Sequence, residues 1–341
     1  MSDELYQLSQ TMLPALNEEM RTVLQVTGDM PTRFYGMIHY HMGWVDAQLQ
    51  PADVHPGKQI RPLLCLLCCQ AAGGDWRQAL PAAAAIEILH NFSLVHDDIE
   101  DASPTRRGRP TVWTLWGVEQ AINAGDAMFA LAHLALNRLT ERGVDAAVVV
   151  EALRRFDETC LHLTQGQHAD MDFETQDTVS VADYLAMITG KTAVLISLCT
   201  ELGARIAGGS TNQIEHYMQF GLNLGLAFQV QDDILGIWGD ETITGKSAAT
   251  DISTRKKTLP VLYGLDQSSD LRQLYRQNDN NPHFVSQVIH FLDECDARAF
   301  TQAKANAYSE GAISHLRAAQ PIGEAGLALH QITDMLLQRQ H

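Results

Sequence analysis

The chain has 341 residues, a net charge of −17 from 24 basic and 41 acidic side chains, and 45% hydrophobic but only 7% aromatic residues. The negative charge argues against nucleic acid or an anionic membrane surface as a main partner. Long Ala/Leu stretches with few β-branched runs favour an all-α fold, and no Pro-, Gly- or Ser-rich linker divides the chain. We therefore expect one large all-α domain spanning residues 1–341.

Helical periodicity and its breaks predict the elements in chain order. A first amphipathic helix covers about 3–26, a second opens at Pro31 and runs to about Leu49, and PADVHPGKQIRP forms a loop. His39 and His41 are two apart on the second helix, so they point to different faces, and core or surface histidines are the expectation. The helices expected after the loop are an apolar one from Leu63, then 81–101, 111–140, 144–172, 181–206 and 211–236, with several shorter helices to the carboxyl end.

The cysteines and the apolar runs bear on the compartment. Three of the six cysteines stand in LLCLLCCQ, where cysteine behaves as a small hydrophobic residue and the second ligand pair of a zinc site is lacking. The amino terminus, MSDELYQLSQ, is too acidic and polar for a signal peptide. No continuous apolar run approaches the roughly 20 residues that cross a bilayer. These features predict a cytoplasmic protein with reduced thiols and no membrane span.

The expected helix 81–101 ends in the acidic sequence DDIED. Carboxylates at a helix carboxyl end oppose the helix dipole and cost stability unless a cation offsets them. Asp97 and Asp101 are one turn apart, about 40° around the helix axis. Two carboxylates on one stripe suit Mg²⁺, a hard ion that takes oxygen ligands and keeps waters that a phosphate can displace. The alternative is a solvated acidic helix end.

Basic residues and a second acidic pair strengthen the first interpretation. The next segment supplies Arg106, Arg107 and Arg109, whose guanidinium forks match phosphate geometry. Asp232 and Asp233 then end another apolar helical run, within FQVQDDILG, and a basic, glycine-containing loop follows them as well. Two such clusters favour a diphosphate site over a solvated surface.

Other residues extend this pattern. Lys58 and Arg61 share a face at a helix start, where the dipole attracts anions, although solvated basic residues are the simpler interpretation of this pair alone. His90 and Ser93 lie on the stripe of the first acidic cluster. Lys191 stands in the apolar setting ITGKTAVLIS, so it needs a negative partner or a route to the surface.

Taken together, the motifs resemble those of the trans-isoprenyl diphosphate synthases (polyprenyl synthetases), and most of all the geranylgeranyl diphosphate synthases. The resemblance covers about residues 57–262 and rests on GKQIRP, DDIED, RRGRP, GQHAD, GKT, FQVQDDILG and the basic GK…D…KK loop, in the family's order. It implies a single large helical bundle of the isoprenoid synthase type with a central cavity, and a homodimer. It also implies head-to-tail condensation of isopentenyl diphosphate with an allylic diphosphate.

The resemblance further implies a role for each matching residue. Metal binding would involve three Mg²⁺ ions, two held by Asp97 and Asp101 and the third by Asp232, with Asp170 and Asp251 nearby through water. The diphosphates would be bound by two sets of residues: Arg106, Lys191 and Lys256 for the allylic one, and Gly57, Lys58, Arg61, His90 and Arg107 for isopentenyl diphosphate. Thr192 and Gln229 would face the developing carbocation.

Two places refine what the resemblance implies. The family's second acidic motif usually ends in Asp, where this chain has Gly236; either Asp251 compensates or the third ion binds more loosely. Product length in the family is read just before the first motif, where this chain has Phe92 and Ser93. An aromatic residue at the place of Phe92 floors the chain tunnel in archaeal-type geranylgeranyl diphosphate synthases, which implies a C20 product. An ordinary core phenylalanine would permit longer products.

Three alternatives stay open. The product could be farnesyl diphosphate or a chain of C25 and above. A terpene cyclase on the same fold would need no isopentenyl site, so Lys58, Arg61 and Arg107 count against it. A non-catalytic regulatory subunit would typically lose the aspartates that this chain retains.

Overall fold

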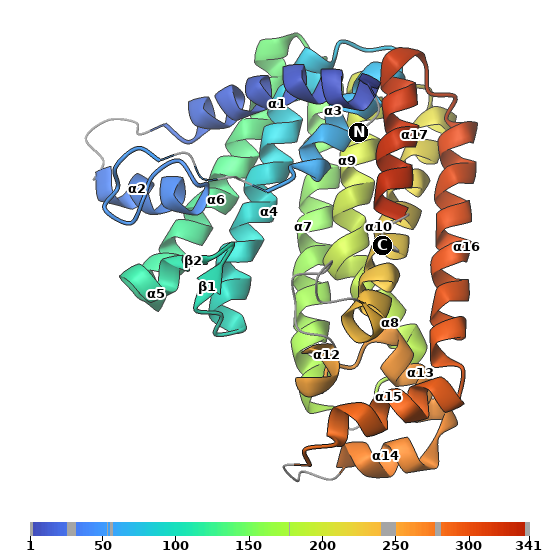
Figure 1. The fold of residues 1–341 in the computed structure, drawn as a ribbon. Helices are drawn as coiled ribbons and strands as arrows, with labels where there is room; N and C mark the ends of the chain where they lie inside the picture. The colour runs from blue at the N-terminus through green and yellow to red at the C-terminus, as the bar shows by residue number, and fades with distance from the viewer. Residues whose placement is uncertain are drawn as a thin grey trace. The chain divides into compact units, whose positions relative to one another are not determined.

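The computed structural model describes residues 3–25, 32–52, 54, 57–176, 178–239, 250–276 and 281–337. Nearly all of this part of the chain is helical (Figure 1). Its strands are the two-residue β1 (Thr105–Arg106) and β2 (Arg109–Pro110), which pair antiparallel in one hairpin. The predicted all-α class is confirmed.

The chain folds as two compact units. The first unit contains Met1–Arg155, Cys199–Ser210 and Pro321–Leu329. The second unit contains Phe156–Leu198, Thr211–Gln320 and His330–His341. Helices α7, α9 and α17 contribute residues to both. The single domain expected from the sequence stays a prediction.

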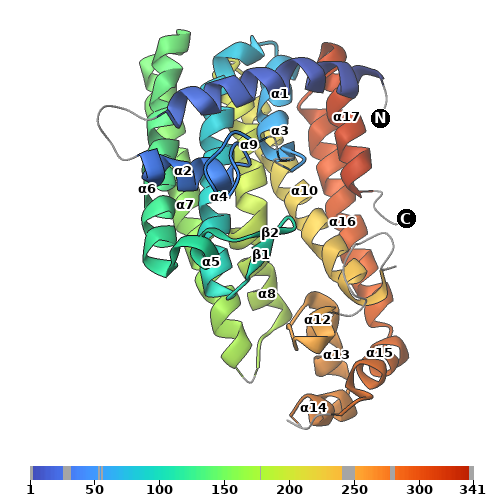
Figure 2. The same cartoon turned by 60° about the vertical axis from the view of Figure 1, so that its left-hand side comes forward.

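The first unit is organised around helix α4. The helices that lie wholly in this unit are α1 (Asp3–Val23), α2 (Thr32–His41), α3 (Ile60–Ala71), α4 (Leu80–Glu100), α5 (Val112–Trp116) and α6 (Val118–Asn137), together with the short 3₁₀ turns η1 (Trp76–Ala79) and η2 (Arg138–Arg142). Helix α4 packs along α6 and against α3 and α1; Figure 2 shows α4 among these helices with the hairpin at its carboxyl end. The alanines at 82–85 are buried, and their small side chains let neighbouring helices pack closely on the first turns of α4. This packing holds the helix in place, and its later turns carry the polar residues.

Two expected helices of this unit are wrong in extent. The second helix ends at His41 rather than about Leu49, and the chain turns at Gly43, whose φ of 82° suits glycine. The helix expected over 111–140 is broken at Gly117, whose φ is 92°, into α5 and α6. The start expected at Pro31 lies outside the described residues.

The second unit is organised around α10. The helices that contribute to it are α7 (Ala146–Thr175), α8 (Val181–Ile188), α9 (Val194–Ile206), α10 (Thr211–Trp238), α12 (Thr250–Ser253), α13 (Leu259–Gln267), α14 (Ser269–Arg276), α15 (Phe284–Glu294), α16 (Ala297–Ala318) and α17 (Gly323–Leu337). Helix α10 packs along α16, which has 22 residues and is longer than the short helices expected near the carboxyl end. The helix expected over 181–206 contains a π-helical turn, η3 (Thr189–Ala193), between α8 and α9. Such turns shift the register of a helix and often occur at functional sites.

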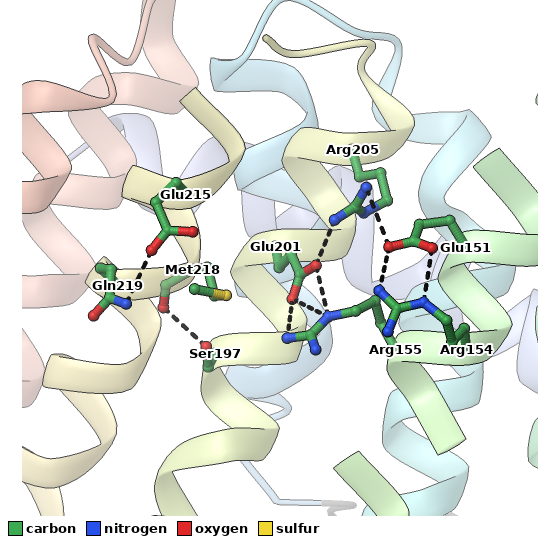
Figure 3. A network of polar contacts seen from close by, with 9 residues as sticks. All are labelled: Glu151, Arg154, Arg155, Ser197, Glu201, Arg205, Glu215, Met218 and Gln219. Atoms are coloured by element: carbon green, nitrogen blue, oxygen red, sulfur yellow. Dashed lines mark hydrogen bonds and ion pairs between the residues drawn. The ribbon is translucent and has the colours of Figure 1, made fainter. Parts of the chain in front are cut away.

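A charged network fixes α7 against α9 within the first unit (Figure 3). The Glu201 side chain is only 1% exposed and accepts hydrogen bonds from Arg155 Nε at 3.0 Å and Nη2 at 2.9 Å, and from Arg205 Nη2 at 2.7 Å. A buried carboxylate needs such partners, because leaving the charge unpaired would cost several kcal/mol, about 3–5. This network lies outside the motifs recognised in the sequence.

All six cysteines are free, and five of them are buried, as expected for residues of an apolar core. Among the described residues, one helical stretch is long and apolar enough for a membrane span, Val181–Ile206, with a mean hydropathy of 1.4 in its 18-residue window. Polar residues, Lys191 among them, interrupt this stretch, so it is not a continuous apolar run, and the expected absence of a membrane span stays a prediction. In this window 61% is buried inside the fold, as in the core helix of a soluble protein.

Candidate active site

The acidic stripe expected on α4 is formed. Asp97 lies in the last turn of the helix, and the Asp101 backbone N–H donates to the Asp97 carbonyl oxygen at 2.8 Å, so the two residues are one turn apart. Asp98 has a different environment. It is 2% exposed, and its Oδ1 accepts a hydrogen bond from Arg106 Nε at 2.8 Å. The stripe therefore offers the carboxylates of Asp97 and Asp101, while Asp98 orients an arginine.

The three arginines of the hairpin have different tasks. Arg106 pairs with Asp98, and Arg107 stands in the turn with a φ of 51°. Arg109 donates from Nη1 to the Tyr40 carbonyl at 3.1 Å and from Nη2 to the Val45 carbonyl at 2.8 Å. Its guanidinium also lies 3.9 Å from the Tyr40 ring centroid. The expectation that Arg109 offers a phosphate fork is wrong, because its terminal nitrogens tie the hairpin to the segment after α2.

Four of the residues expected at the isopentenyl site are brought together in the first unit. Arg61, in the first turn of α3, has Nη1 3.4 Å from His90 Nε2 on α4. Gly57 adopts a φ of 95°, which favours glycine, and a Cβ there would lie 3.2 Å from Arg107 Nη2, a tight contact with the guanidinium. Lys58 is exposed just before α3. A loop, two helices and the hairpin thus supply one basic cluster.

The electrostatics of this cluster suit an anion. Burial, reinforced by Arg61 and Arg107, holds the pKa of His90 well below its ordinary value. Burial and the hairpin arginines Arg107 and Arg106 lower the pKa of His41 to about 3. Both imidazoles therefore stay neutral beside guanidinium groups, and Arg61 Nε has no hydrogen-bond partner among the described residues. A bound anion would relieve the repulsion between the arginines and satisfy an unpaired donor.

The sequence reasoning missed three members of this cluster. They are His41, which was expected to be an ordinary core or surface histidine, the buried Glu87, and Asp98 as the partner of Arg106. Burial raises the pKa of Glu87, and Arg61 acts in the opposite direction. Glu87 lies ten residues before Asp97 on α4 in an apolar run, and only its buried position in the fold identifies it.

Close glycine contacts bring the second unit's polar residues together. A Cβ at Gly166 on α7 would collide with the backbone of Gly190 and Lys191 in η3. One turn beyond Gly166, the Asp170 carboxylate accepts a hydrogen bond from Lys191 Nζ. The negative partner that the sequence required for Lys191 is thus Asp170, and the GQHAD and GKT motifs are parts of one contact.

A similar contact joins α10 to η3. A Cβ at Gly225 would lie 2.6 Å from the Ala193 Cα, so the two backbones touch. One turn further along α10, Gln229 Oε1 accepts a hydrogen bond from Thr192 Oγ1 at 3.1 Å. The two residues expected to face a carbocation are therefore paired.

Asp233 forms a buried junction that sequence reasoning missed. It is 2% exposed and accepts hydrogen bonds from Tyr184 OH at 2.5 Å, from the Leu259 N–H at 3.2 Å and from Gln229 Nε2 at 3.2 Å. Burial raises the pKa of Asp233 to about 7, and these three donors act in the opposite direction. Burial and Asp233 also raise the pKa of Tyr184 well above its ordinary value, so the phenol keeps its proton. Its neighbour Asp232 is half-buried on the same helix.

Gly236 makes room for a carboxylate from another helix. A Cβ at Gly236 would collide with Asp251 Oδ2 and lie 3.1 Å from its Cγ. Gly236 is one turn beyond Asp232, so the Asp251 carboxylate stands over the place where the resemblance implies a second aspartate. The Asp251 carbonyl also accepts the Lys256 N–H at 2.8 Å.

Phe92 belongs to a row of rings between α4 and α6. Its ring centroid is 5.1 Å from that of Phe129 and 4.8 Å from that of His96, and Phe129 is 4.7 Å from His133. The Ser93 hydroxyl donates to the His90 carbonyl at 2.9 Å. The Phe92 ring on α4 thus packs against a second aromatic ring, that of Phe129 on α6.

The donor set fits magnesium. Among the described residues, no group of three or more His, Cys, Asp or Glu side chains is arranged to hold a metal ion by itself. Mg²⁺ does not require one, because it binds through one or two carboxylates together with water and substrate phosphate oxygens. Asp97 and Asp101 on one turn, and the oxygens of Asp232 and Asp251 around Gly236, have that character.

Comparison with known proteins agrees with this chemistry. The family model described as Polyprenyl synthetase matches residues 44–292. The chain belongs to the polyprenyl synthetase family. A geranylgeranyl diphosphate synthase of Mycobacterium tuberculosis is 46% identical over 234 residues, 69% of this chain, and a (2E,6E)-farnesyl diphosphate synthase of Mycobacterium bovis is 43% identical over 242 residues, 71% of this chain. Each alignment spans 66% of the mycobacterial protein's length.

The likeness in structure extends over nearly the whole chain. The crystal structure of a polyprenyl synthetase from Streptomyces coelicolor A3(2) is 32% identical and has a TM-score of 0.86, with 98% of each chain covered. The fold type and the family expected from the motifs are confirmed. The relatives are prenyl diphosphate synthases, which is the enzyme class expected for this polyprenyl synthetase.

Proposed function

We propose that this chain is a Mg²⁺-dependent head-to-tail prenyltransferase that condenses isopentenyl diphosphate with an allylic diphosphate and releases geranylgeranyl diphosphate. The observation that carries the proposal is the basic cluster of Gly57, Arg61, His90 and Arg107. A terpene cyclase needs acidic motifs but no second diphosphate site, whereas a prenyltransferase needs both. The cluster gathers guanidinium groups and neutral imidazoles around an unpaired donor, as a diphosphate site requires.

The first unit would bind both diphosphates. Arg61 and Arg107 would hold isopentenyl diphosphate, with His90 donating a neutral N–H and Lys58 closing from the exposed side. Arg106, oriented by Asp98, would contact the allylic diphosphate beside Asp97 and Asp101. Bound Mg²⁺, three ions in all, would neutralise the charge that develops on the leaving diphosphate.

The resemblance assigns the remaining roles to residues of the later motifs. Lys191 and Lys256 would contact the allylic diphosphate, and the oxygens of Asp170, Asp232 and Asp251 would complete the metal shells, two of them through water. Thr192 and Gln229 would direct their oxygen lone pairs toward the allylic cation as the C–O bond breaks. The double bond of isopentenyl diphosphate then attacks the cation. A proton leaves to the released diphosphate, so no protein carboxylate is needed as a base.

Phe92 would end the space for the growing chain, which supports a C20 product. Its contact with Phe129 gives the floor a second layer, so the ring resists displacement by a prenyl tail. The farnesyl diphosphate synthase among the relatives supports a shorter product as the alternative.

A homodimer in the cytoplasm completes the proposal. Large apolar side chains of the first unit are exposed on α5, α6 and the start of α7: Leu115, Val118, Ile122, Leu134 and Val150. Burying such residues against a second copy would gain free energy. The six free cysteines are consistent with a reducing compartment. Light scattering during size-exclusion chromatography measures the oligomer directly.

Product analysis tests the function. The purified protein is incubated with Mg²⁺, labelled isopentenyl diphosphate and each allylic primer in turn, and the dephosphorylated alcohols are separated by size. A dominant C20 alcohol is expected. Longer alcohols would retain the chemistry and overturn the floor assigned to Phe92, and the absence of elongation with every primer would overturn the proposed reaction.

A further inference from the structure

We propose that Asp233 is a positioning residue that sets which end of the Gln229 amide is presented beside Thr192. The inference deepens the proposed function and rests on it, because the benefit of that orientation comes from the cationic intermediate. Asp233 itself would touch neither substrate nor metal. Its effect would pass through Gln229.

The hydrogen bonds around Asp233 determine the orientation. Its Oδ1 accepts from Gln229 Nε2 at 3.2 Å. Because Oδ1 is the acceptor in this contact, the Gln229 side chain turns its NH₂ group toward Asp233. The amide oxygen then points the other way, where it accepts the Thr192 hydroxyl at 3.1 Å. The Thr192 hydroxyl uses its proton in this hydrogen bond, so the lone pairs of its oxygen remain to face a cation.

The carboxylate is held so that it cannot turn away. Its other oxygen, Oδ2, accepts from Tyr184 OH on α8 and from the Leu259 N–H at the start of α13. Thr258, the N-cap residue of α13, makes no side-chain cap bond, so Asp233 performs this function in its place. Helices α8 and α13 thus fix one buried carboxylate of α10, and the carboxylate fixes one amide.

The orientation has a chemical consequence. The amide oxygen carries negative partial charge, which stabilises a nearby allylic cation, whereas the NH₂ group would oppose it. Dipoles that are already oriented when charge develops cost no reorganisation in the transition state, and removing one such group typically lowers kcat about 10²- to 10³-fold. We expect the orienting residue to matter on a similar scale.

Asp233→Asn tests the orientation with the smallest change in shape. The amide oxygen that it introduces can still accept from Tyr184 and Leu259, but the new NH₂ group then faces Gln229, which must flip. We expect kcat to fall about 10²-fold with the KM values of both substrates unchanged.

A double variant reverses the donor and the acceptor. When Gln229→Glu is combined with Asp233→Asn, the amide introduced at position 233 donates to the carboxylate introduced at position 229. The second oxygen of that carboxylate then faces Thr192, as the amide oxygen of Gln229 does in the wild-type protein. This double variant should recover most of the kcat that Asp233→Asn loses.

A matched control separates positioning from folding. Tyr184→Phe removes one donor to Oδ2 and leaves the contact with Gln229, so it should lower Tm while leaving kcat close to wild type. Wild-type kcat in Asp233→Asn, or a double variant no better than Asp233→Asn, would overturn the inference.

Failure of the proposed function is recognised separately. In that case the wild-type protein itself makes no prenyl product, and the hydrogen-bond arrangement is tested by Tm alone. Gln229→Glu places two carboxylates against each other and should lower Tm strongly, and adding Asp233→Asn should restore it. If Asp233→Asn brings no recovery of Tm in the Gln229→Glu background, the orientation is wrong whatever the reaction.

Discussion

Replacing Gly236 by alanine tests how this chain manages without the last aspartate of its second acidic motif. The new Cβ would collide with Asp251 Oδ2 and lie 3.1 Å from Asp251 Cγ, so the carboxylate must leave its place over α10. Alanine also favours the helix over glycine, by up to about 1 kcal/mol. The variant should therefore keep or slightly gain stability while it loses one oxygen donor beside Asp232.

The expected result is weaker binding of the metal rather than a loss of fold. Residues that support a metal through water or a hydrogen bond change its affinity about 10- to 100-fold when they are removed. We expect the Mg²⁺ concentration for half-maximal activity of Gly236→Ala to rise by a factor in that range. A second readout does not need turnover: the increase in Tm produced by Mg²⁺ with a non-reactive diphosphate should require correspondingly more metal.

Two further variants isolate the contribution of the Asp251 carboxylate. Asp251→Ala should reproduce the Mg²⁺ shift, and adding Gly236→Ala should not enlarge it, because both changes remove the same oxygen. Gly236→Asp combined with Asp251→Ala restores an aspartate one turn beyond Asp232 and should return the Mg²⁺ dependence toward wild type. An unchanged Mg²⁺ dependence in Gly236→Ala, with the fold intact by circular dichroism, would refute the role given to Asp251.

Three other predictions follow from the first unit. Arg107→Ala should raise the KM for isopentenyl diphosphate about 30-fold, since a lost charged hydrogen bond costs about 2 kcal/mol. The KM for the allylic substrate should change less. Steady-state kinetics with each substrate varied measures both values, and an equal rise would contradict the role of Arg107. Phe92→Ala should lengthen the product, and adding Phe129→Ala should lengthen it further, as chromatography of the alcohols would show; an unchanged length would contradict the floor. In the unfolded state His41 takes up a proton below about pH 6.5, whereas in the folded state its imidazole stays neutral down to about pH 3. Between these pH values His41 should therefore lower the free energy of unfolding by about 1.4 kcal/mol per pH unit on acidification. Urea titrations should show a shallower loss in His41→Asn, and an equal loss in both proteins would contradict the cause.

Features governed by neighbours along the chain were predictable. The helix that carries DDIED ends within one residue of the expected position, because the proline- and glycine-rich segment after it cannot continue a helix. The stripe of Asp97 and Asp101 follows from the helical repeat alone. The requirement of Lys191 for a partner followed from its apolar surroundings, and the partner, Asp170, belongs to a motif already recognised.

Breaks inside helices were less predictable. Gly117 and the η3 turn interrupt segments whose periodicity continues on both sides. The η3 turn is explained by what packs on it, since the backbones of Gly166 and Gly225 touch η3 at Gly190, Lys191 and Ala193. A hydrophobic pattern records which residues are buried and not how closely two backbones approach.

The sequence by itself determined the all-α class, the family and the set of polar residues available for chemistry, because composition, helical periodicity and motif order are properties of the chain read locally. Only the tertiary structure decided what each of those residues does. It distinguished Arg109, which holds backbone carbonyls, from Arg106, which pairs with Asp98. It also brought Asp233 to Tyr184, 49 residues away, and placed Asp251 over Gly236. Hydrogen bonds and steric exclusion act over a few ångströms in space, and a linear sequence does not contain those distances.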